Sequence, residues 1–279
     1  MIGFDYPGIN DSLLAWLRED IGTGDVTTSS CVPAVADSTG EFVVKQPGII
    51  CGLDVISRVY KLINANVRVT PYAIDGESVE SGDIVAGIWG QSQAILTGER
   101  LVLNLLQHMS GIATMTAQAV KAVSGTQTRI TDTRKTTPGM RVFDKYAVRC
   151  GGGSNHRLSL ADGVLIKDNH INAAGGIANA IELARERCPH TLRIEVETES
   201  LLQVEEALEA GADIIMLDNM DPELMASAVK LIGGRAVTEA SGNMGDRDLK
   251  TVAATGVDYI SIGALTHSVK ALDISLKFR

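Results

Sequence analysis

Residues 192–219 read L-R-I-E-V-E-T-E-S-L-L-Q-V-E-E-A-L-E-A-G-A-D-I-I-M-L-D-N. The runs at 192–196 and 214–217 are short and rich in branched aliphatic residues, which is typical of buried β-strands. Between them, residues 201–209 carry apolar side chains at helical spacing. A strand, a helix and a second strand in this order predict two parallel strands joined by a right-handed crossover. This stretch therefore favours an α/β fold with a parallel sheet.

The same alternation extends through the chain from Arg129 onward. Further strands are expected at 128–131, 163–166, 236–238 and 259–262, and further helices at 173–187 and 222–231. Repeats of roughly 20 to 35 residues with this order are typical of α/β barrels. Because about six such units are present, short of the eight of a complete barrel, the sequence predicts an irregular, incomplete α/β barrel of about six strands.

The first third of the chain lacks this alternation and has an α+β pattern. Asn10 or Asp11 can cap an amphipathic helix that ends near Gly22. Strands are expected at 40–45, 67–73 and 84–90, and helices at 55–64 and 93–123. The last of these helices is long and apolar, and Ser110 and Gly111 are expected to interrupt it. We expect it to link two domains.

Composition and charge exclude several classes of protein. Of the 279 residues, 45% are hydrophobic, which is enough for a sizeable core. The net charge of −9 and the pI near 5.1 argue against nucleic acid as a partner. No apolar run reaches the roughly 18 residues of a membrane span, and the first residues lack the pattern of a signal peptide, so a cytoplasmic location without membrane contact is expected.

The four cysteines, Cys31, Cys51, Cys150 and Cys188, are scattered along the chain. They form no C-x-x-C pair and have no histidine at zinc-ligand spacing. We therefore expect ordinary reduced side chains and neither a disulfide framework nor a structural zinc ion.

Positive charge is concentrated between Arg129 and Lys167. This segment holds eight Lys or Arg residues and three Asp residues, a local charge of +5 in an acidic chain. Planar guanidinium groups bind carboxylate or phosphate through two hydrogen bonds, and lysine adds a compact charge. The residues in Gly-rich or polar surroundings are expected to bind a small polyanion; they are Arg134, Lys135, His156, Arg157 and Lys167. By contrast, Arg141, Lys145 and Arg149 are expected to lie on the solvated face of a helix.

Acidic residues follow or end two of the expected strands. Glu195 and Glu197 lie two positions apart and project to one side of a strand, while Asp218 follows the run I-I-M-L. Since a buried carboxylate is costly without a cation, inward-facing acids need a partner. Glu197 and Asp218 could share Mg²⁺, bind sugar hydroxyls or stabilise positive charge on a sugar. The alternative is a pair of salt bridges to the basic cluster.

Glycine-rich turns follow the last two expected strands. Ser241-Gly242-Asn243 and Gly263 are placed where the last loops of many barrels bind phosphate through backbone N–H groups. A Schiff-base role for Lys167 is a rival interpretation, but it requires an apolar pocket, whereas this lysine lies in K-D-N-H.

Together the motifs resemble one family. They are E-D-I-G-T-G-D-V-T-T (19–28), G-E-R-L-V-L-N-L-L-Q-H-M-S-G-I-A-T (98–114), T-R-K-T-T-P-G (133–139), K-Y-A-V-R-C-G-G-G-S-N-H-R (145–157), L-I-K-D-N-H (165–170), E-V-E (195–197), L-D-N (217–219), E-A-S-G-N (239–243) and G-A-L-T-H-S (263–268). In this order and over nearly the full length, they resemble the quinolinate phosphoribosyltransferases.

The resemblance implies a reaction and an architecture. Quinolinate and phosphoribosyl pyrophosphate, with Mg²⁺, would give nicotinate mononucleotide, pyrophosphate and carbon dioxide in NAD synthesis. An N-terminal α/β sandwich would span 1–107 and the barrel 108–265, and residues 266–279 would return to the first domain. The assembly would be a homodimer, or a higher oligomer, with sites shared between subunits.

The resemblance also implies roles for individual residues. Arg134, His156, Arg157 and Lys167 would hold the two quinolinate carboxylates with Arg100 of a second subunit, next to Thr133. Lys135 would assist the pyrophosphate, with Lys167 shared. Glu197 and Asp218 would serve the ribose and Mg²⁺, directly or indirectly, and Ser241, Gly242, Asn243 and Gly263 would take the 5′-phosphate. The catalytic residues would be Lys135, Lys167, Glu197 and Asp218. A non-catalytic protein that binds phosphorylated metabolites is the competing hypothesis, which the two acids disfavour.

Overall fold

A computed structural model describes residues 6–279, which form two compact units. The first unit combines the residues up to Ala117 with Thr137–Gly152 and Ser268–Arg279. The second combines Gln118–Thr136 with Gly153–His267. The domain boundaries expected from the sequence, after residues 107 and 265, stay predictions. No helix within residues 6–279 is both long and apolar enough to cross a membrane.

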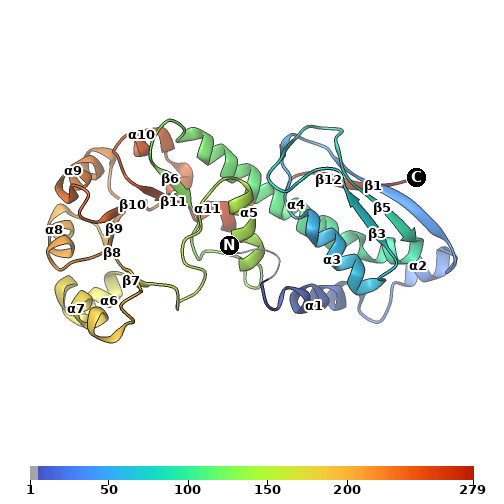
Figure 1. Ribbon diagram of the computed structural model, residues 1–279, viewed down its shortest axis with the longest axis horizontal. Coiled ribbons are helices and arrows are strands. Elements are labelled where there is room, and N and C mark those ends of the chain that lie inside the picture. The colour runs from blue at the N-terminus through green and yellow to red at the C-terminus, as the bar shows by residue number, and fades with distance from the viewer. Residues whose placement is uncertain (1–5) are drawn as a thin grey trace. The chain divides into compact units, whose positions relative to one another are not determined.

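The first unit is built on a four-stranded antiparallel sheet in the order β12-β1-β5-β3 (Figure 1). The central strands, β1 (Asp37–Val44) and β5 (Ile84–Gln91), pair with Phe42 opposite Ala86, and both of these residues are fully buried. The closing strand β12 (Ile274–Phe278) pairs with β1, so the end of the chain completes this sheet. The other strands are β3 (Arg68–Pro71) and a separate pair formed by β2 (Gly48–Ile49) and β4 (Ser78–Val79).

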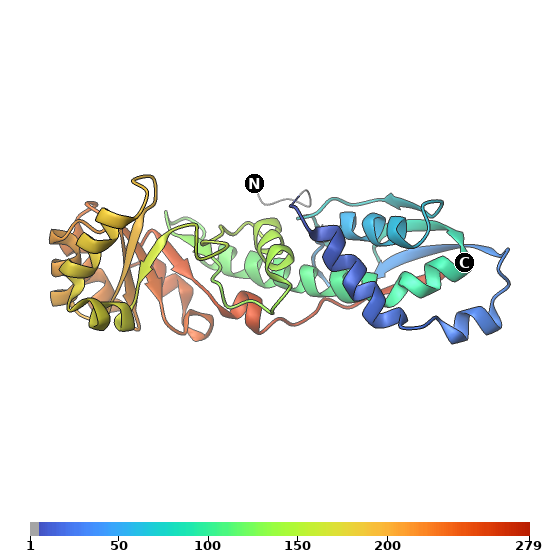
Figure 2. The same ribbon diagram turned by 90° about the horizontal axis from the view of Figure 1, so that it is seen from below.

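Helices complete the first unit. Helix α1 (Ile9–Ile21) lies against α3 (Leu53–Ile63) (Figure 2). The apolar side chains of α3 recur at helical spacing and are buried. The others are α2 (Val26–Cys31), α4 (Ser92–Ala122) and α5 (Arg141–Cys150). Helix α4 begins in the first unit and its last turn belongs to the second.

The expected break of the long helix at Ser110 and Gly111 is wrong, because α4 is continuous over 31 residues. A Cβ atom at position 111 would lie 2.3 Å from the carbonyl oxygen of Lys270, so glycine permits the returning chain to pass close to the helix. The Ser110 hydroxyl accepts the backbone N–H of Cys51 at 2.9 Å. The two residues therefore serve packing contacts and do not end the helix.

The expectation for the basic residues of α5 is also wrong in part. Arg149 is exposed, as expected, but the Lys145 side chain is fully buried. The helix buries Phe143, Asp144, Ala147 and Val148 as well, so its buried face includes Lys145, a charged residue that the sequence suggested was exposed.

The second unit contains six parallel strands in the order β6-β11-β10-β9-β8-β7, which confirms the predicted incomplete barrel (Figure 1). Helices cover the outer side of these strands, and residues such as Val196, Ile215 and Ile260 are buried in the core. The strands are β6 (Arg129–Thr131), β7 (Val164–Ile166), β8 (Ile194–Thr198), β9 (Ile214–Asp218), β10 (Val237–Ser241) and β11 (Tyr259–Ser261). The helices are α6 (Asp168–Ala174), α7 (Ile177–Arg187), α8 (Leu201–Glu209), α9 (Pro222–Ile232), η1 (Met244–Asp246), α10 (Leu249–Ala253) and α11 (Ala264–His267).

The helix expected at 173–187 is divided in two. Helix α6 ends at Ala174 because Gly175 adopts φ 84°, the left-handed conformation that closes many helices. Gly176 follows with φ 138°, and α7 begins at Ile177. The sequence places both glycines inside the expected helix, where each is costly, and the structure uses them as a turn.

Candidate active site

The carboxyl ends of the parallel strands bring the polar residues of the second unit together. Glu197 on β8 pairs in register with Met216 on β9, and Asp218 at the end of β9 pairs with Ser241 at the end of β10. Lys167 directly follows β7. Because these strands are parallel, their side chains reach the same end of the sheet, where barrels place their ligand sites.

A cavity of about 460 Å³ lies at this end of the strands. Its walls include eleven of the thirteen residues predicted to bind substrate, which are Thr133, Arg134, Lys135, His156, Arg157, Lys167, Glu197, Asp218, Ser241, Gly242 and Asn243. Of the other two, Arg100 is exposed on α4 in the first unit. Gly263 does not line the cavity but lies beneath Lys135, whose Cδ atom is 3.0 Å from the position of a Cβ at 263. The functional roles of all thirteen residues stay predictions.

Lys167 forms an ion pair with Glu197 across one wall of the cavity. Its backbone N–H donates to Nδ1 of His170, which fixes the start of α6. The contact with Glu197 is one of the salt bridges considered as an alternative for the acids. A ligand carboxylate that binds Lys167 must therefore share this ammonium group with Glu197 or take it over.

The loops after β9 and β10 are locked to each other. The Asn219 backbone has φ 54°, its N–H donates to the Ser241 carbonyl at 3.1 Å, and its side-chain amide donates to Asp218 at 2.6 Å. Gly242, with φ 91°, leaves room for Asn219, because a Cβ there would lie 2.2 Å from Oδ1 of Asn219. With no side chain at 242, the backbone itself forms this wall, as a close anion contact requires.

The loop that holds Arg134 and Lys135 is fixed by hydroxyl groups. The backbone N–H of Lys135 donates to Oγ1 of Thr133 at 3.0 Å, and Oγ1 of Thr266 donates to the Lys135 carbonyl at 2.8 Å. These bonds set the direction of the loop while the lysine side chain crosses Gly263.

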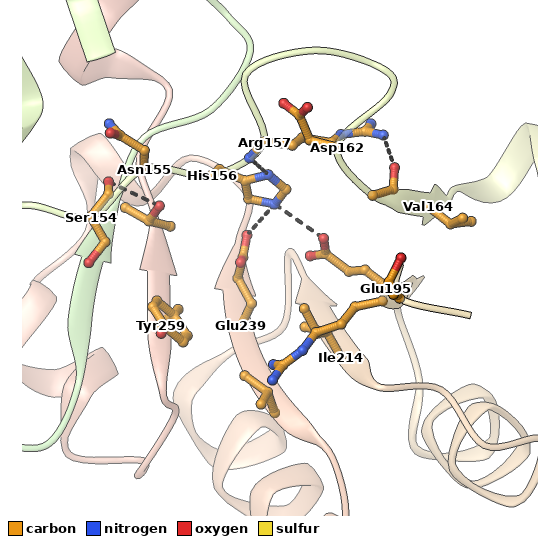
Figure 3. Close-up of a pocket in the computed structure, with 15 residues that line it drawn as sticks. Ser154, Asn155, His156, Arg157, Asp162, Val164, Glu195, Ile214, Glu239 and Tyr259 are labelled. Carbon is orange, nitrogen blue, oxygen red and sulfur yellow. Dashed lines mark hydrogen bonds and ion pairs between the residues drawn. The ribbon is translucent and has the colours of Figure 1, made fainter. Parts of the chain in front are cut away.

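The loop after α5 turns around buried Asp132, which is fully enclosed. Asp132 accepts the His156 backbone N–H at 2.9 Å and the Asn155 side-chain amide at 2.6 Å. Arg157 donates from its guanidinium to the Gly163 carbonyl at 3.1 Å (Figure 3). These bonds place Arg157 beside the cavity, and burial together with the nearby Arg134 lowers the pKa of its guanidinium.

The His156 ring points toward two buried acids, Glu195 and Glu239 (Figure 3). Its Nε2 atom is 3.2 Å from Oε2 of Glu195 and 3.7 Å from Oε1 of Glu239, and its Nδ1 atom accepts the backbone N–H of Arg157 at 2.8 Å. Burial and, after it, the charge of Glu195 raise the pKa of Glu239 to about 7, although His156 acts in the opposite direction. This shift is typical of a functional site.

Sequence reasoning assigned no role to Glu239 or Asp132. The signal for Glu239 was its place in E-A-S-G-N near the end of an expected strand, two positions before Ser241, so that both residues face one side. Asp132 follows β6 in the same way. Acids at or near the ends of β6, β8, β9 and β10 indicate a polar interior, and the alternation of the strands could have identified it.

The chain is similar to known proteins of one family. Residues 25–110 match the N-terminal domain and residues 112–277 the C-terminal domain of the quinolinate phosphoribosyl transferase family. A Bacillus subtilis protein named as a probable carboxylating nicotinate-nucleotide pyrophosphorylase is 48% identical, over 92% of this chain and 89% of its own length. The crystal structure of NadC from Streptococcus pyogenes is 44% identical with a TM-score of 0.91, over 97% of each chain. The nicotinate-nucleotide pyrophosphorylase from Francisella tularensis is 40% identical with a TM-score of 0.92, also over 97% of each chain.

Proposed function

Since this chain belongs to the quinolinate phosphoribosyltransferase family, we propose that its cavity carries out that reaction. The enzyme transfers the phosphoribosyl group of phosphoribosyl pyrophosphate to quinolinate and releases pyrophosphate and carbon dioxide, which yields nicotinate mononucleotide for de novo NAD synthesis. The observation that supports this most is the composition of one cavity wall: four cationic side chains stand beside three carboxylates and a glycine-containing loop. A pyridine dicarboxylate, a ribose and a phosphate need these three kinds of partner.

We assign the two ends of the cavity to the two substrates. Arg134, Arg157 and Lys167 bind the quinolinate carboxylates, and Arg100 of a second subunit completes this end. His156 supports Arg157 from below, because its Nδ1 atom already accepts the Arg157 backbone N–H. At the other end, Glu197 and Asp218 face the ribose, Ser241–Asn243 and Gly263 hold the 5′-phosphate, and Lys135 meets the pyrophosphate.

The chemistry requires alignment and charge, and no side-chain nucleophile. As the pyrophosphate leaves, positive charge develops on the ribose ring, and the carboxylates of Glu197 and Asp218 stabilise it. The pyridine nitrogen, held in line by its two carboxylates, attacks the anomeric carbon. Once the C–N bond forms, the positively charged ring nitrogen stabilises the electron pair that stays on the adjacent ring carbon when its carboxylate leaves as carbon dioxide, and a proton from water then binds to that carbon.

Mg²⁺ fits the residues at the ribose end. Glu197 and Asp218 offer carboxylate oxygens, which are the ligands that this ion prefers, and both line the cavity. Since Glu197 already contacts Lys167, we propose that Asp218 would hold the ion. When bound, the ion neutralises charge on the leaving pyrophosphate.

We also propose a cytoplasmic homodimer with shared sites. The exposed position of Arg100 on α4 supports this, because a cation there is free to serve a pocket of another subunit. Sedimentation at equilibrium and cell fractionation test the assembly and the location.

A turnover assay tests the function. Purified protein with quinolinate, phosphoribosyl pyrophosphate and Mg²⁺ should release carbon dioxide and nicotinate mononucleotide in equal amounts, and nicotinate should be a poor substitute because it lacks one carboxylate for the cations. Arg157→Ala should lose activity, while Glu205→Gln, a change on the exposed face of α8, should keep it. A folded protein that binds both substrates but forms no product would instead support the binding-protein hypothesis.

A further inference from the structure

Two buried glutamates below the substrate cavity share one histidine. Glu195 on β8 and Glu239 on β10 are 4% and 5% exposed, and both face Nε2 of His156 (Figure 3). Within residues 6–279, the Oε1 atoms of both glutamates have no hydrogen-bond partner. Since a buried carboxylate oxygen without a partner is costly, this cluster must hold a cation or a proton.

The orientation of the His156 ring decides whether the cluster holds a metal cation or a proton. Its Nδ1 atom accepts the Arg157 N–H, so Nδ1 is unprotonated and the neutral ring carries its hydrogen on Nε2, toward Glu195. A metal ion could be reached by atoms of all three side chains, which lie within 4.8 Å of one another. However, a neutral histidine that binds metal through Nε2 must carry its hydrogen on Nδ1, where it would face the N–H of Arg157. The ring therefore favours a proton.

Among the cluster, Glu239 is the residue that carries this proton. Glu195 already accepts the Nε2–H group of His156 at 3.2 Å, whereas Glu239 is 0.5 Å farther from the ring. Burial disfavours negative charge on Glu239 most, and the neighbouring Glu195 and, to a smaller extent, Asp132 raise its pKa in the same direction. The groups around Glu239 come from every neighbouring element: Glu195 on β8, Met216 on β9, Tyr259 and Ser261 on β11, Asp132 after β6, and His156 with Arg157 on the loop after α5.

Glu239 also lines the substrate cavity. The charged side chains of that wall are Arg134, Lys135, Arg157 and Lys167, against Glu197, Asp218 and Glu239. With Glu239 ionised, 4 − 3 leaves a charge of +1 to receive two anionic substrates. With Glu239 neutral, 4 − 2 leaves +2.

We propose that Glu239 is a positioning residue that stays protonated in the quinolinate complex even at the higher pH at which the free enzyme has lost this proton, so that binding of the dianion at that pH takes a proton up. The inference rests on the proposed function, since it names quinolinate as the ligand. Protonation removes one negative charge from the cavity wall that receives the carboxylates, so the attraction of Arg134, Arg157 and Lys167 for them is opposed by one acid fewer.

Calorimetric titration with quinolinate in buffers of different ionisation enthalpy measures the protons taken up. From a pKa of Glu239 of about 7 in the free protein, we expect uptake of about 0.9 proton at pH 8 and about 0.1 at pH 6, with the quinolinate Kd about tenfold weaker at pH 8. Glu239→Gln cannot ionise, so its Kd should change less than about twofold over this range and it should take up no proton. Glu205→Gln on α8 is the matched control and should behave as the wild type.

A second variant separates ionisation from a packing effect. The Ser261 hydroxyl lowers the pKa of Glu239 through a hydrogen bond, so Ser261→Ala should move the midpoint of the Kd profile to higher pH. Proton uptake by the wild type below about 0.2 at pH 8, or equal uptake in Glu239→Gln, overturns the proposal. The proposed function is still supported in that case if the protein turns over quinolinate. A stoichiometric metal ion that is lost in Glu239→Gln and kept in Asp218→Asn also overturns it, because the cluster would then be a metal site.

Discussion

Replacing Gly242 with alanine should weaken the binding of phosphoribosyl pyrophosphate and leave quinolinate binding unchanged. The new Cβ would lie 2.2 Å from Oδ1 and 2.8 Å from the backbone nitrogen of Asn219, so the loop after β9 must move. That movement breaks the 2.6 Å contact between Asn219 and Asp218 and displaces the backbone that is proposed to hold the 5′-phosphate. A hydrogen bond to a charged group contributes about 1.5–3 kcal/mol, so loss of one raises the KM for this substrate by about 10- to 150-fold.

The variant must be separated from simple backbone strain. At φ 91°, alanine at 242 costs about 1–2 kcal/mol in stability, before the collision with Asn219 is counted. Gly175→Ala is the matched control: its φ is 84° and no atom lies within 4 Å of its Cβ position, so it has the strain without the collision.

Steady-state kinetics with each substrate varied in turn, together with the melting temperature of both variants, measures the two effects. Gly175→Ala should lose a few degrees of thermal stability, about 2–4 °C for each kcal/mol, and keep both KM values. Gly242→Ala should lose more stability and also show the raised KM. If the KM of Gly242→Ala for phosphoribosyl pyrophosphate stays within twofold of the control, the assignment of this loop to the 5′-phosphate is wrong.

Three further predictions follow from the structure. Mixing inactive Arg100→Ala with inactive Arg157→Ala should restore part of the activity through heterodimers, and no recovery despite proven subunit exchange would mean that each site is built from one chain. Gly111→Ala should lower the free energy of unfolding by about 1–3 kcal/mol in urea titrations, because its Cβ would lie 2.3 Å from the Lys270 carbonyl oxygen; unchanged stability would show that the chain there can shift freely. Between pH 4.5 and about 7 the unfolded chain releases the proton that folded Glu239 retains, so the free energy of unfolding falls as pH rises through this window. The wild type should lose up to about 3 kcal/mol of this free energy, and Glu239→Gln should not show that loss. Parallel pH profiles of the two proteins would contradict this.

The barrel and the position of its site could be predicted because both depend on local patterns. A buried strand such as β9 reads as a continuous apolar run, and helix α8 has the predicted bounds, Leu201–Glu209. Once the strands are known to be parallel, their carboxyl ends must meet, which brings Lys167, Glu197 and Asp218 to one cavity although they are far apart in sequence.

Two glycines show where such patterns stop being informative. Gly111 and Gly175 both interrupt a helical pattern, yet the first lies inside α4 and the second ends α6. The difference comes from distant chain: the Lys270 carbonyl occupies the space beside Gly111, whereas nothing approaches Gly175, whose backbone is free to turn. A single sequence carries no sign of such a contact.

The charge of the site was the hardest property to predict. Counting residue types gives five anion-binding groups, but the His156 ring faces Glu195 at 3.2 Å, and Lys167 is already paired with Glu197. The sequence places both acids, Glu195 and Glu197, on one strand, but only the fold shows which basic residue each of them contacts. The positive charge offered to quinolinate is therefore smaller than the motif suggests. It depends on events that accompany binding: the exchange of Glu197 for a substrate carboxylate at Lys167, and the protonation of Glu239 beneath the cations. Binding of quinolinate is therefore coupled to changes at Glu197 and Glu239. The affinity for quinolinate should vary with pH even though the arginines of the site do not titrate in the physiological range.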